Sequence, residues 1–208
     1  VFYSGNSYSQ KDSSGVYLTE NDFVSGKLKY AVNCKTSCEK LSIDLLFKPK
    51  KIKVKYCDSV ITLEKSKVYA VKLCDEKLVR IINNESYPLL NPGEQIVLYK
   101  ITKTIGGKTP KVVEEYFFSN GASGHIQPLT VANIKSTFPD NHRFHDLLET
   151  EFKTNSELMK YDSFLKMYRI NHLFKDSQDR YYYCPIHSDE TSPKPARCPK
   201  CETEMKCK

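Results

Sequence analysis

The sequence predicts an α+β protein with an antiparallel, β-rich body, two or three C-terminal helices packed on it and a small Cys/His-rich knuckle or ribbon. Three observations predict this class. Short segments rich in β-branched and aromatic residues fill residues 16–128, and amphipathic helical patterns follow between residues 130 and 174. Four of the eight cysteines then fall within residues 184–208, together with a histidine.

The composition is that of a folded globular chain. Hydrophobic residues make up 39% and charged residues 27% of the 208 residues, which excludes a fully disordered protein. The length suffices for one core-forming domain and a small appendage. No apolar run reaches about 18 residues, so we expect no transmembrane segment.

Residues 1–9 resemble the remnant of a secretory signal peptide. Apolar residues give way to small ones, and Ser7-Tyr8-Ser9 has the small-x-small arrangement that signal peptidase accepts. Cleavage after Ser9 would leave Gln10 at the mature N-terminus. We therefore expect an exported bacterial protein, periplasmic, secreted or at the cell surface. The alternative is a cytosolic protein cut at an arbitrary boundary.

The body, residues 10–174, begins with strands. Turn formers such as Asn83-Asn84, Asn91-Pro92-Gly93 and Gly106-Gly107 separate them, and the glycine pair predicts a hairpin because glycine tolerates positive φ. No long helical pattern intervenes, so an antiparallel sheet, sandwich or open barrel is expected. The predicted strands are VYLT, KLKYAV, LSIDLLF, KIKVKY, SVITL, KVYAVKL, KLVRII, QIVLYKIT and VVEEYFF.

One predicted strand is strongly basic. Its lysines alternate with Ile52, Val54 and Tyr56, which indicates a strand with one face in the core and one in water. Lysines on an edge strand also discourage aggregation. A basic stretch can instead mark nucleic acid, an anionic membrane surface or an acidic partner; we expect no nucleic acid. The lysines are Lys48, Lys50, Lys51, Lys53 and Lys55.

Helical patterns follow the strands. Residues 130–138 predict a short helix, and residues 139–152 a longer one with Asp140 or Asn141 as its cap. Residues 156–174 predict another amphipathic helix, and these two would lay their apolar stripes on the sheet. The stripes are Phe144, Leu147, Leu148 and Phe152 in the first, and Leu158, Tyr161, Leu165 and Tyr168 in the second.

No catalytic constellation is evident. His142 and His145 are spaced so that both could bind one metal ion, but no acidic or cysteine partner is placed to complete the site. We interpret them as surface histidines. The chain has no glycine-rich phosphate loop, no GxSxG elbow and no HExxH motif. We therefore expect a protein that is not an enzyme.

The body contains Cys34, Cys38, Cys57 and Cys74, an even number that in an exported chain predicts one or two disulfides. Four cysteines allow three pairings. Cys57 and Cys74 each follow a predicted strand and could pair if those strands end side by side, while Cys34 and Cys38 could close a small loop. The alternative is that some are simply small buried residues.

After a linker at residues 175–180, the tail, residues 181–208, has the spacing of a metal site. Cys184-x-x-His187 and Cys198-x-x-Cys201 each bring two donors within one turn, and two such knuckles supply four ligands for a tetrahedral ion. Pro185 and Pro199 fix φ after the first cysteine of each knuckle. The alternative is a disulfide-bonded tail, in which Cys198 pairs with Cys201 or both pair with Cys184 and Cys207.

The tail resembles the short heavy-metal-binding domain of bacterial copper and silver efflux adaptors and of some copper-transporting P-type ATPases. The resemblance rests on Tyr182, Cys184-Pro185, His187, the ten-residue gap, Lys194-Pro195 and Cys198-Pro199-Lys200-Cys201. It implies a metal site made by Cys184, His187, Cys198 and Cys201. The body is similar to exported bacterial proteins of unknown function.

The tail departs from the family pattern at several positions. Ile186 stands for the first Met, Ser188 for a Pro, and Glu202-Thr203 for the closing Gly-Met. Without those thioethers Cu(I) or Ag(I) is less favoured, and the remaining Cys/His donors suit Zn(II) at least as well. Cys207 and Met205 are auxiliary ligand candidates.

These observations favour an exported metal-binding protein. The Cys3His site would bind Zn(II), or a copper-group ion, for buffering, sensing or transfer to a protein partner in a metal-handling system. The alternative is a non-catalytic interaction module in which the same residues hold a purely structural zinc and the β-rich body binds a partner.

Overall fold

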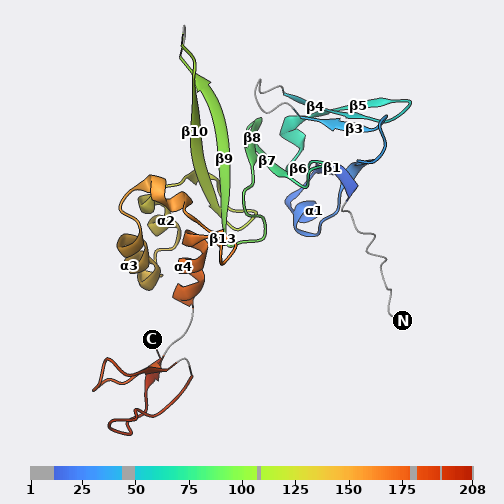
Figure 1. Cartoon of the computed structure of the whole chain (residues 1–208). Helices are drawn as coiled ribbons and strands as arrows, with labels where there is room; N and C mark the ends of the chain where they lie inside the picture. The colour runs from blue at the N-terminus through green and yellow to red at the C-terminus, as the bar shows by residue number, and fades with distance from the viewer. Residues whose placement is uncertain (1–11, 44–49, 107–108, 179–181, 193, 208) are drawn as a thin grey trace, which may run out of the picture. The chain divides into compact units, whose positions relative to one another are not determined.

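The computed structural model describes residues 12–43, 50–106, 109–178, 182–192 and 194–207 (Figure 1). The predicted leader remnant, residues 1–9, lies outside the described residues. The chain is an antiparallel, β-rich α+β protein, as predicted, and it divides into two compact units between Pro128 and Leu129. This division falls inside the segment 10–174 that the sequence predicts as one body. Before it, β1 to β11 pair in sheets, and after it the helices α3 (His142–Glu151) and α4 (Arg169–Gln178) contact each other.

The first unit contains a five-stranded antiparallel sheet with the strand order β2-β1-β6-β7-β8. Its strands are β1 (Ser13–Tyr17), β2 (Lys29–Asn33), β6 (Ala70–Lys72), β7 (Leu78–Ile82) and β8 (Glu85–Pro88). A short helix, α1 (Glu20–Val24), connects β1 to β2. Thr19 caps this helix by accepting a hydrogen bond from the Asp22 backbone N–H.

A second sheet in the same unit has the order β3-β4-β5, with β3 (Lys40–Ser42), β4 (Lys51–Lys55) and β5 (Val60–Glu64). A 3-10 turn, η2 (Lys65–Lys67), follows it. The lysines of β4 are exposed while Ile52 and Val54 are fully buried, so the predicted alternation is confirmed. Edge protection does not explain these lysines, because β4 is the central strand.

The two sheets share one hydrophobic core. Side chains from both contribute to a single buried cluster, which is the expected result when each sheet has one apolar face to cover. The cluster consists of Val16, Val32, Leu41, Ile52, Val54, Val68, Val71, Val79 and Ile81.

The predicted hairpin around Gly106 is confirmed. Strands β9 (Ile96–Ile105) and β10 (Lys111–Asn120) pair along their whole length, and β11 (Gln127–Pro128) adds to β10 (Figure 1). Gly106 has φ +102°, a conformation that glycine adopts at little cost. Gly107 lies outside the described residues.

Two disulfides cross-link the first unit, Cys34–Cys74 and Cys38–Cys57, so all four body cysteines are bonded. The suggested pairings of Cys57 with Cys74 and of Cys34 with Cys38 are wrong. The physical reason is that Cys57 follows β4 and Cys74 follows β6, which belong to different sheets, so these strand ends do not meet.

Strand register explains the observed pairs. Lys40 of β3 faces Lys55 of β4, and two positions further out the same register brings Cys38 opposite Cys57, with a Cα–Cα distance of 4.8 Å. Strands β2 and β6 lie on either side of β1, and both run antiparallel to it. Their carboxyl ends therefore lie at the same end of the sheet. Cys34 and Cys74 follow those ends, 5.5 Å apart at Cα.

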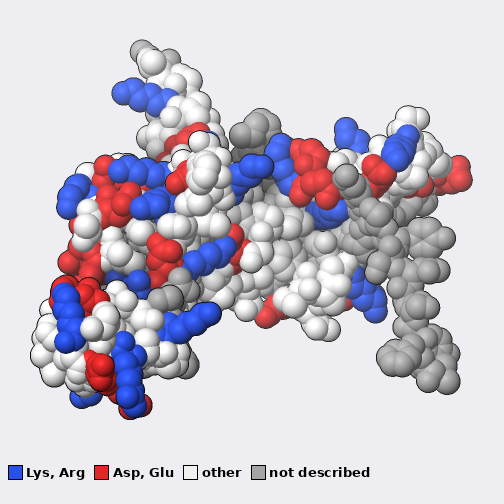
Figure 2. Space-filling model, turned by 60° about the horizontal axis from the view of Figure 1, so that its bottom comes forward, with Lys and Arg blue, Asp and Glu red and all other residues white. Residues whose placement is uncertain are grey.

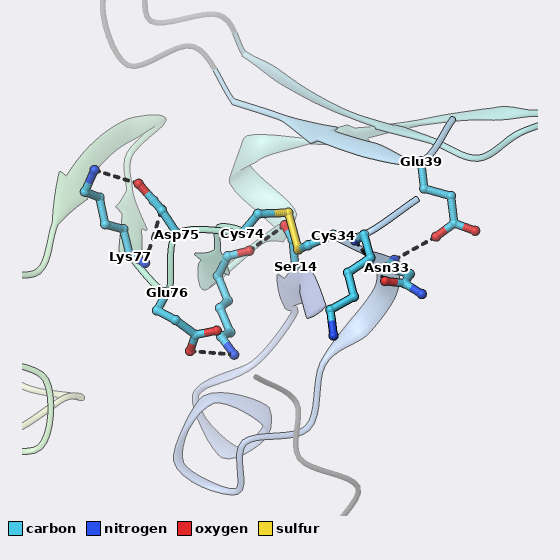
Figure 3. The surroundings of a disulfide bond; sticks show 10 residues. Ser14, Asn33, Cys34, Glu39, Cys74, Asp75, Glu76 and Lys77 are labelled. Carbon is cyan, nitrogen blue, oxygen red and sulfur yellow. Dashed lines mark hydrogen bonds and ion pairs between the residues drawn. A yellow bond between two sulfur atoms is a disulfide. The ribbon is translucent and has the colours of Figure 1, made fainter. Parts of the chain in front are cut away.

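The surroundings of the Cys34–Cys74 bridge are polar (Figure 3). The Ser14 hydroxyl donates to the Lys72 carbonyl at 2.8 Å, and the Glu39 carboxylate accepts from the Asn33 backbone N–H at 2.7 Å. The Lys72 ammonium lies 3.0 Å from the Glu76 carboxylate. These contacts fix the strand ends that carry the two cysteines.

The second unit begins with the helices α2 (Val131–Thr137) and α3 (His142–Glu151), both as predicted. Asn141 is the cap of α3, because its side chain accepts from the Phe144 backbone N–H at 3.0 Å. Rings of Phe138, Phe144 and Phe174 contact one another, with centroids 4.8 to 5.9 Å apart, so the apolar faces of these helices meet.

The predicted single helix over residues 156–174 is wrong. The segment contains a 3-10 turn η3 (Asn155–Met159), the strands β12 (Tyr161–Asp162) and β13 (Met167–Tyr168), and only then the helix α4 (Arg169–Gln178). Asp162 breaks the helix, because its side chain accepts from the backbone N–H groups of Phe164 and Leu165, both at 2.9 Å.

Helix α4 continues to Gln178, so residues 175–178 of the predicted linker are helical; residues 179 and 180 lie outside the described residues. Across the described part of the chain, no helix combines the length and apolarity needed to cross a membrane.

Candidate metal centre

The tail contains a small antiparallel sheet with the strand order β15-β14-β16. Its strands are β14 (Tyr182–Tyr183), β15 (Thr191–Ser192) and β16 (Lys206–Cys207). Strand β14 leads directly into Cys184, and the chain then turns. Backbone N–H groups of Ile186 and His187 donate to Cys184 Sγ at 3.4 and 3.3 Å, which orients the first knuckle.

The second knuckle is closed by its own backbone hydrogen bonds. The N–H of Glu202 donates to the carbonyl of Cys198 at 2.8 Å, and the N–H of Cys198 donates to the carbonyl of Thr203 at 2.9 Å. Glu202, at the position where the expected heavy-metal-binding pattern has glycine, has φ +58°. The left-handed turn is therefore present without glycine, at the strain that a side chain brings to that region.

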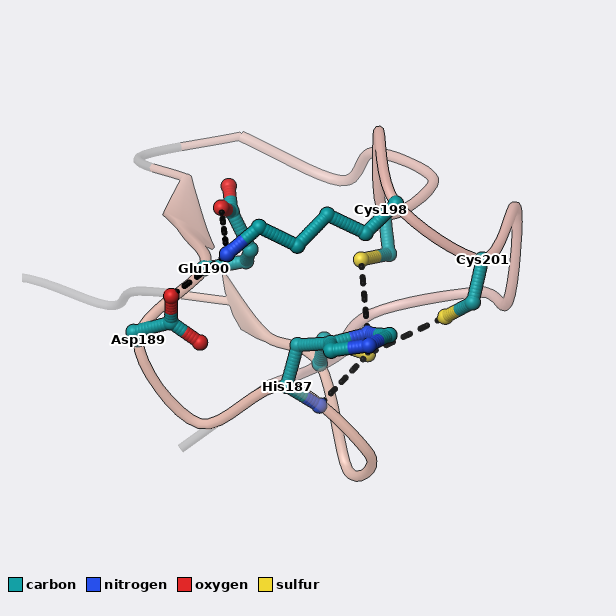
Figure 4. Close-up of polar contacts among 7 residues, drawn as sticks. His187, Asp189, Glu190, Cys198 and Cys201 are labelled. Atoms are coloured by element: carbon teal, nitrogen blue, oxygen red, sulfur yellow. Dashed lines mark hydrogen bonds and ion pairs between the residues drawn. The ribbon is translucent and has the colours of Figure 1, made fainter.

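The four predicted ligands converge. Their donor atoms all lie within 4.8 Å of one another (Figure 4). Cys184 Sγ is 3.5 Å from Cys201 Sγ and 3.8 Å from His187 Nδ1, and Cys198 Sγ is 3.6 Å from His187 Nδ1. No disulfide joins Cys184, Cys198 or Cys201. Three sulfurs and one ring nitrogen at these separations can surround a single ion.

Two of the candidate ligands, Cys184 and Cys198, form the interior of the tail. Cys184 is 0% and Cys198 is 1% exposed, whereas His187 and Cys201 are partly exposed. Among the described residues of 182–206, no other side chain is buried. The tail therefore has no apolar core beyond the cysteines themselves, and a bound ion would supply the cross-link that a core normally provides.

Hydrogen bonds favour the thiolate form of two cysteines, Cys201 and Cys184. The Thr203 hydroxyl, 3.4 Å from Cys201 Sγ, and the Thr203 backbone N–H lower the pKa of the Cys201 thiol to about 6. Burial opposes ionisation of Cys184, but the N–H groups of His187 and Ile186 outweigh it and lower the pKa of that thiol. Burial raises the pKa of the Cys198 thiol. Contacts with Cys184 and Cys201 raise the pKa of His187.

An ion-pair clamp joins the two knuckles. The ammonium of Lys200, between the two cysteines of the second knuckle, lies 2.6 Å from the Asp189 carboxylate and 2.8 Å from that of Glu190 (Figure 4). Both carboxylates follow His187 of the first knuckle. They raise the pKa of Lys200, so the Lys200 ammonium stays protonated throughout the neutral range.

The donor set fits Zn(II). Cys3His is a common structural zinc set, with tetrahedral geometry and no open position. Of the auxiliary candidates, Met205 lines a surface pocket with Pro195, Ala196, Arg197 and Glu204. The Cys207 side chain lies outside the described residues.

The other histidine pair forms no such site. The rings of His142 and His145 lie in an edge-to-face arrangement, 5.9 Å apart at their centroids, and His145 Nε2 is 2.9 Å from the Phe138 carbonyl. Within the described residues, the tail contains the one cluster of three or more Cys, His or acidic side chains whose donor atoms are close enough to bind a single ion.

No protein-family model matches the chain, and no curated protein and no solved structure is detectably similar to it. The geometry of the tail therefore carries the functional argument.

Proposed function

We propose that this chain is an exported metal-binding protein whose tail holds one Zn(II) ion through Cys184, His187, Cys198 and Cys201. The observation that carries the proposal is the convergence of all four donor atoms within 4.8 Å. Three thiolates and an imidazole suit a d10 ion of borderline softness. Cu(I) and Ag(I) are the competing ions, favoured by the three sulfurs.

The body supports the proposed compartment. Two disulfides link its four cysteines, and such bonds persist in the bacterial periplasm and outside the cell. In the same compartment the three described tail thiols need protection from oxidation, and a bound metal ion would supply it. We therefore place the chain in the periplasm, at the cell surface or in the medium of a bacterium.

The donor number supports binding rather than catalysis. A catalytic zinc keeps three protein ligands and leaves the fourth position for water or substrate. Four converging protein donors occupy every tetrahedral position. We propose capture, buffering or transfer of the ion as the role of the site, with a protein partner as donor or acceptor.

A structural role for the same ion is the second candidate, and one observation favours it. Cys184 and Cys198 are the buried residues in the described part of the tail, so an ion bound to them would stabilise the fold of the tail. In that case the β-rich body or the tail surface would bind the partner. Exchange separates the two roles: a structural ion should leave over hours, whereas a transferable one should pass to a chelator of matched affinity within minutes.

The test of metal binding is elemental analysis of protein purified without chelators. We expect one equivalent of zinc in the parent chain and less than about a tenth in Cys198→Ser. The matched control is Lys194→Gln, at an exposed position of the tail, which should keep a full equivalent. Unchanged metal content in Cys198→Ser would remove the proposed site. Circular dichroism of the disulfide-linked unit should be the same in all three proteins.

A further inference from the structure

A second feature, independent of the metal site, is the exposed face of the sheet β3-β4-β5. Residues that pair across an antiparallel sheet point to the same side, so the register defines this face. Lysines dominate it, and all of its members are exposed. The face consists of Lys40, Ser42, Lys51, Lys53, Lys55, Val60, Thr62 and Glu64.

The lysine face is electrostatically unbalanced. Four lysines and one glutamate give it a local net charge of +3. Among the described residues, no carboxylate forms an ion pair with Lys40, Lys51, Lys53 or Lys55. By contrast, Figure 2 shows both signs of charge interspersed over the surface that it presents.

One cross-strand pair of this face is unfavourable, although Lys51 lies opposite Glu64. Lys40 lies directly opposite Lys55 in the register, and like charges in that position repel. Because β4 is the central strand, its lysines do not protect an edge from aggregation. Packing of the core does not require this excess of positive charge on β4, whereas an anionic partner would use it.

The composition of the face indicates which anionic partner it fits. It has no aromatic side chain on which a nucleic-acid base could stack. Val60, which is 59% exposed, pairs with Lys55 and so places an apolar group beside the ammonium groups. A lipid bilayer offers both acidic headgroups and an apolar interior, which a soluble polyanion does not.

We propose that the lysine face is a docking surface for a bilayer that contains acidic phospholipids. Each lysine near such a surface strengthens binding about fivefold, so a net charge of three gives about a hundredfold preference over a neutral bilayer. Binding of this kind is reversible and weakens as salt screens the charges.

The experiment is co-sedimentation of the full chain with vesicles of phosphatidylcholine alone or with about a third phosphatidylglycerol. We expect about a hundredfold stronger partitioning onto the anionic vesicles at low salt and its loss near 0.5 M NaCl. A quadruple variant, Lys40→Gln, Lys51→Gln, Lys53→Gln and Lys55→Gln, should lose this preference. Its thermal stability should be unchanged or slightly higher, because the repulsion between Lys40 and Lys55 is gone.

The matched control removes the same charge elsewhere, through Lys27→Gln, Lys111→Gln, Lys166→Gln and Lys194→Gln, all at exposed positions. It should keep the preference within about fivefold. Equal loss in both quadruple variants would show an effect of net charge alone and overturn the proposal. So would equal binding to neutral vesicles, or binding to an acidic polymer or DNA without binding to anionic vesicles.

Discussion

The ammonium of Lys200 lies 2.6 Å from the carboxylate of Asp189, and this ion pair connects the two halves of the metal centre. Glu190 completes the clamp at 2.8 Å. The three residues lie beside the candidate ligands in the sequence, so the ion pairs join the two knuckles close to the donor atoms.

Replacement of Lys200 should weaken metal binding without removing a ligand. We expect Lys200→Gln to lower the affinity for zinc about two- to fivefold, because an exposed ion pair contributes modestly. Competition with a chromophoric chelator at low ionic strength measures this, and the difference should shrink at 0.5 M salt. The control, Lys194→Gln, should bind as the parent does. A loss of the same size in the control would contradict the clamp.

Thr203→Val should make the metal-free site less reactive. The pKa of Cys201 is about 6 mainly because its hydrogen bonds with the hydroxyl and the backbone N–H of Thr203 favour the thiolate, so removal of the hydroxyl should raise that pKa toward the ordinary thiol range. Alkylation of Cys201 at pH 6.5 by iodoacetamide, followed by peptide mass spectrometry, reports the thiolate fraction. Thr191→Val is the control. An unchanged rate in Thr203→Val would refute the assignment.

The same shift predicts how stability of the metal-free tail depends on pH. The folded form holds Cys201 as a thiolate above about pH 6, whereas in the unfolded chain the thiol ionises near 9. The unfolded chain therefore holds more protons at Cys201 within this window, so the contribution of Cys201 to stability rises with pH from about 6 to 9. Below pH 6 this contribution disappears. The raised pKa values of His187 and Cys198 act in the opposite direction, so the comparison of the parent with Thr203→Val isolates Cys201. Denaturant titrations of both at pH 5.5 and 8.5 should show a stability difference in favour of the parent that is larger at pH 8.5, and a difference that is larger at pH 5.5 would contradict the assignment.

Removal of the metal should destabilise the tail, without abolishing its folded form at neutral pH, and should spare the rest of the chain. The buried residues of the tail are two ligand cysteines, while the disulfide-linked sheets have their own core. Hydrogen exchange before and after chelation should show reduced protection in β14 and β16 and no change in β4 or β7. Unchanged protection throughout the tail would mean that the ion does not stabilise its fold.

Removal of each disulfide should destabilise the first unit to a different extent. The Cys34–Cys74 bridge spans 40 residues and the Cys38–Cys57 bridge spans 19. Loop-closure entropy gives about 4 kcal/mol for the first and about 3 kcal/mol for the second. Denaturation of the two double Cys→Ser variants measures both. Cys198→Ser is the control and should leave unfolding of this unit unchanged.

The sequence allowed prediction of the features that are local in the chain. Lysines alternating with Ile52 and Val54 were enough to identify β4 and its two faces. The four candidate metal donors were evident because each pair lies within one turn of chain and the two pairs share one short segment.

The interrupted helix and the disulfide pairing depend on specific contacts that the hydrophobic pattern of the sequence does not encode. The helix expected at residues 156–174 is interrupted because the Asp162 side chain accepts hydrogen bonds from the turn that follows it, which competes with helical bonding. The disulfide pairing required knowledge of which strands lie side by side. Once Lys40 is known to face Lys55, the Cys38–Cys57 pair follows from counting.

The two bridges are nested, since Cys38 and Cys57 both lie between Cys34 and Cys74 in the chain. In the oxidising compartment proposed for this chain, Cys34 and Cys38 would arrive first during export and be each other's nearest thiols in the sequence. An oxidase that joins successive cysteines would trap a small ring that must be reopened before β4 and β6 can dock. Efficient maturation therefore calls for a disulfide isomerase, and yield without one should fall while scrambled species accumulate.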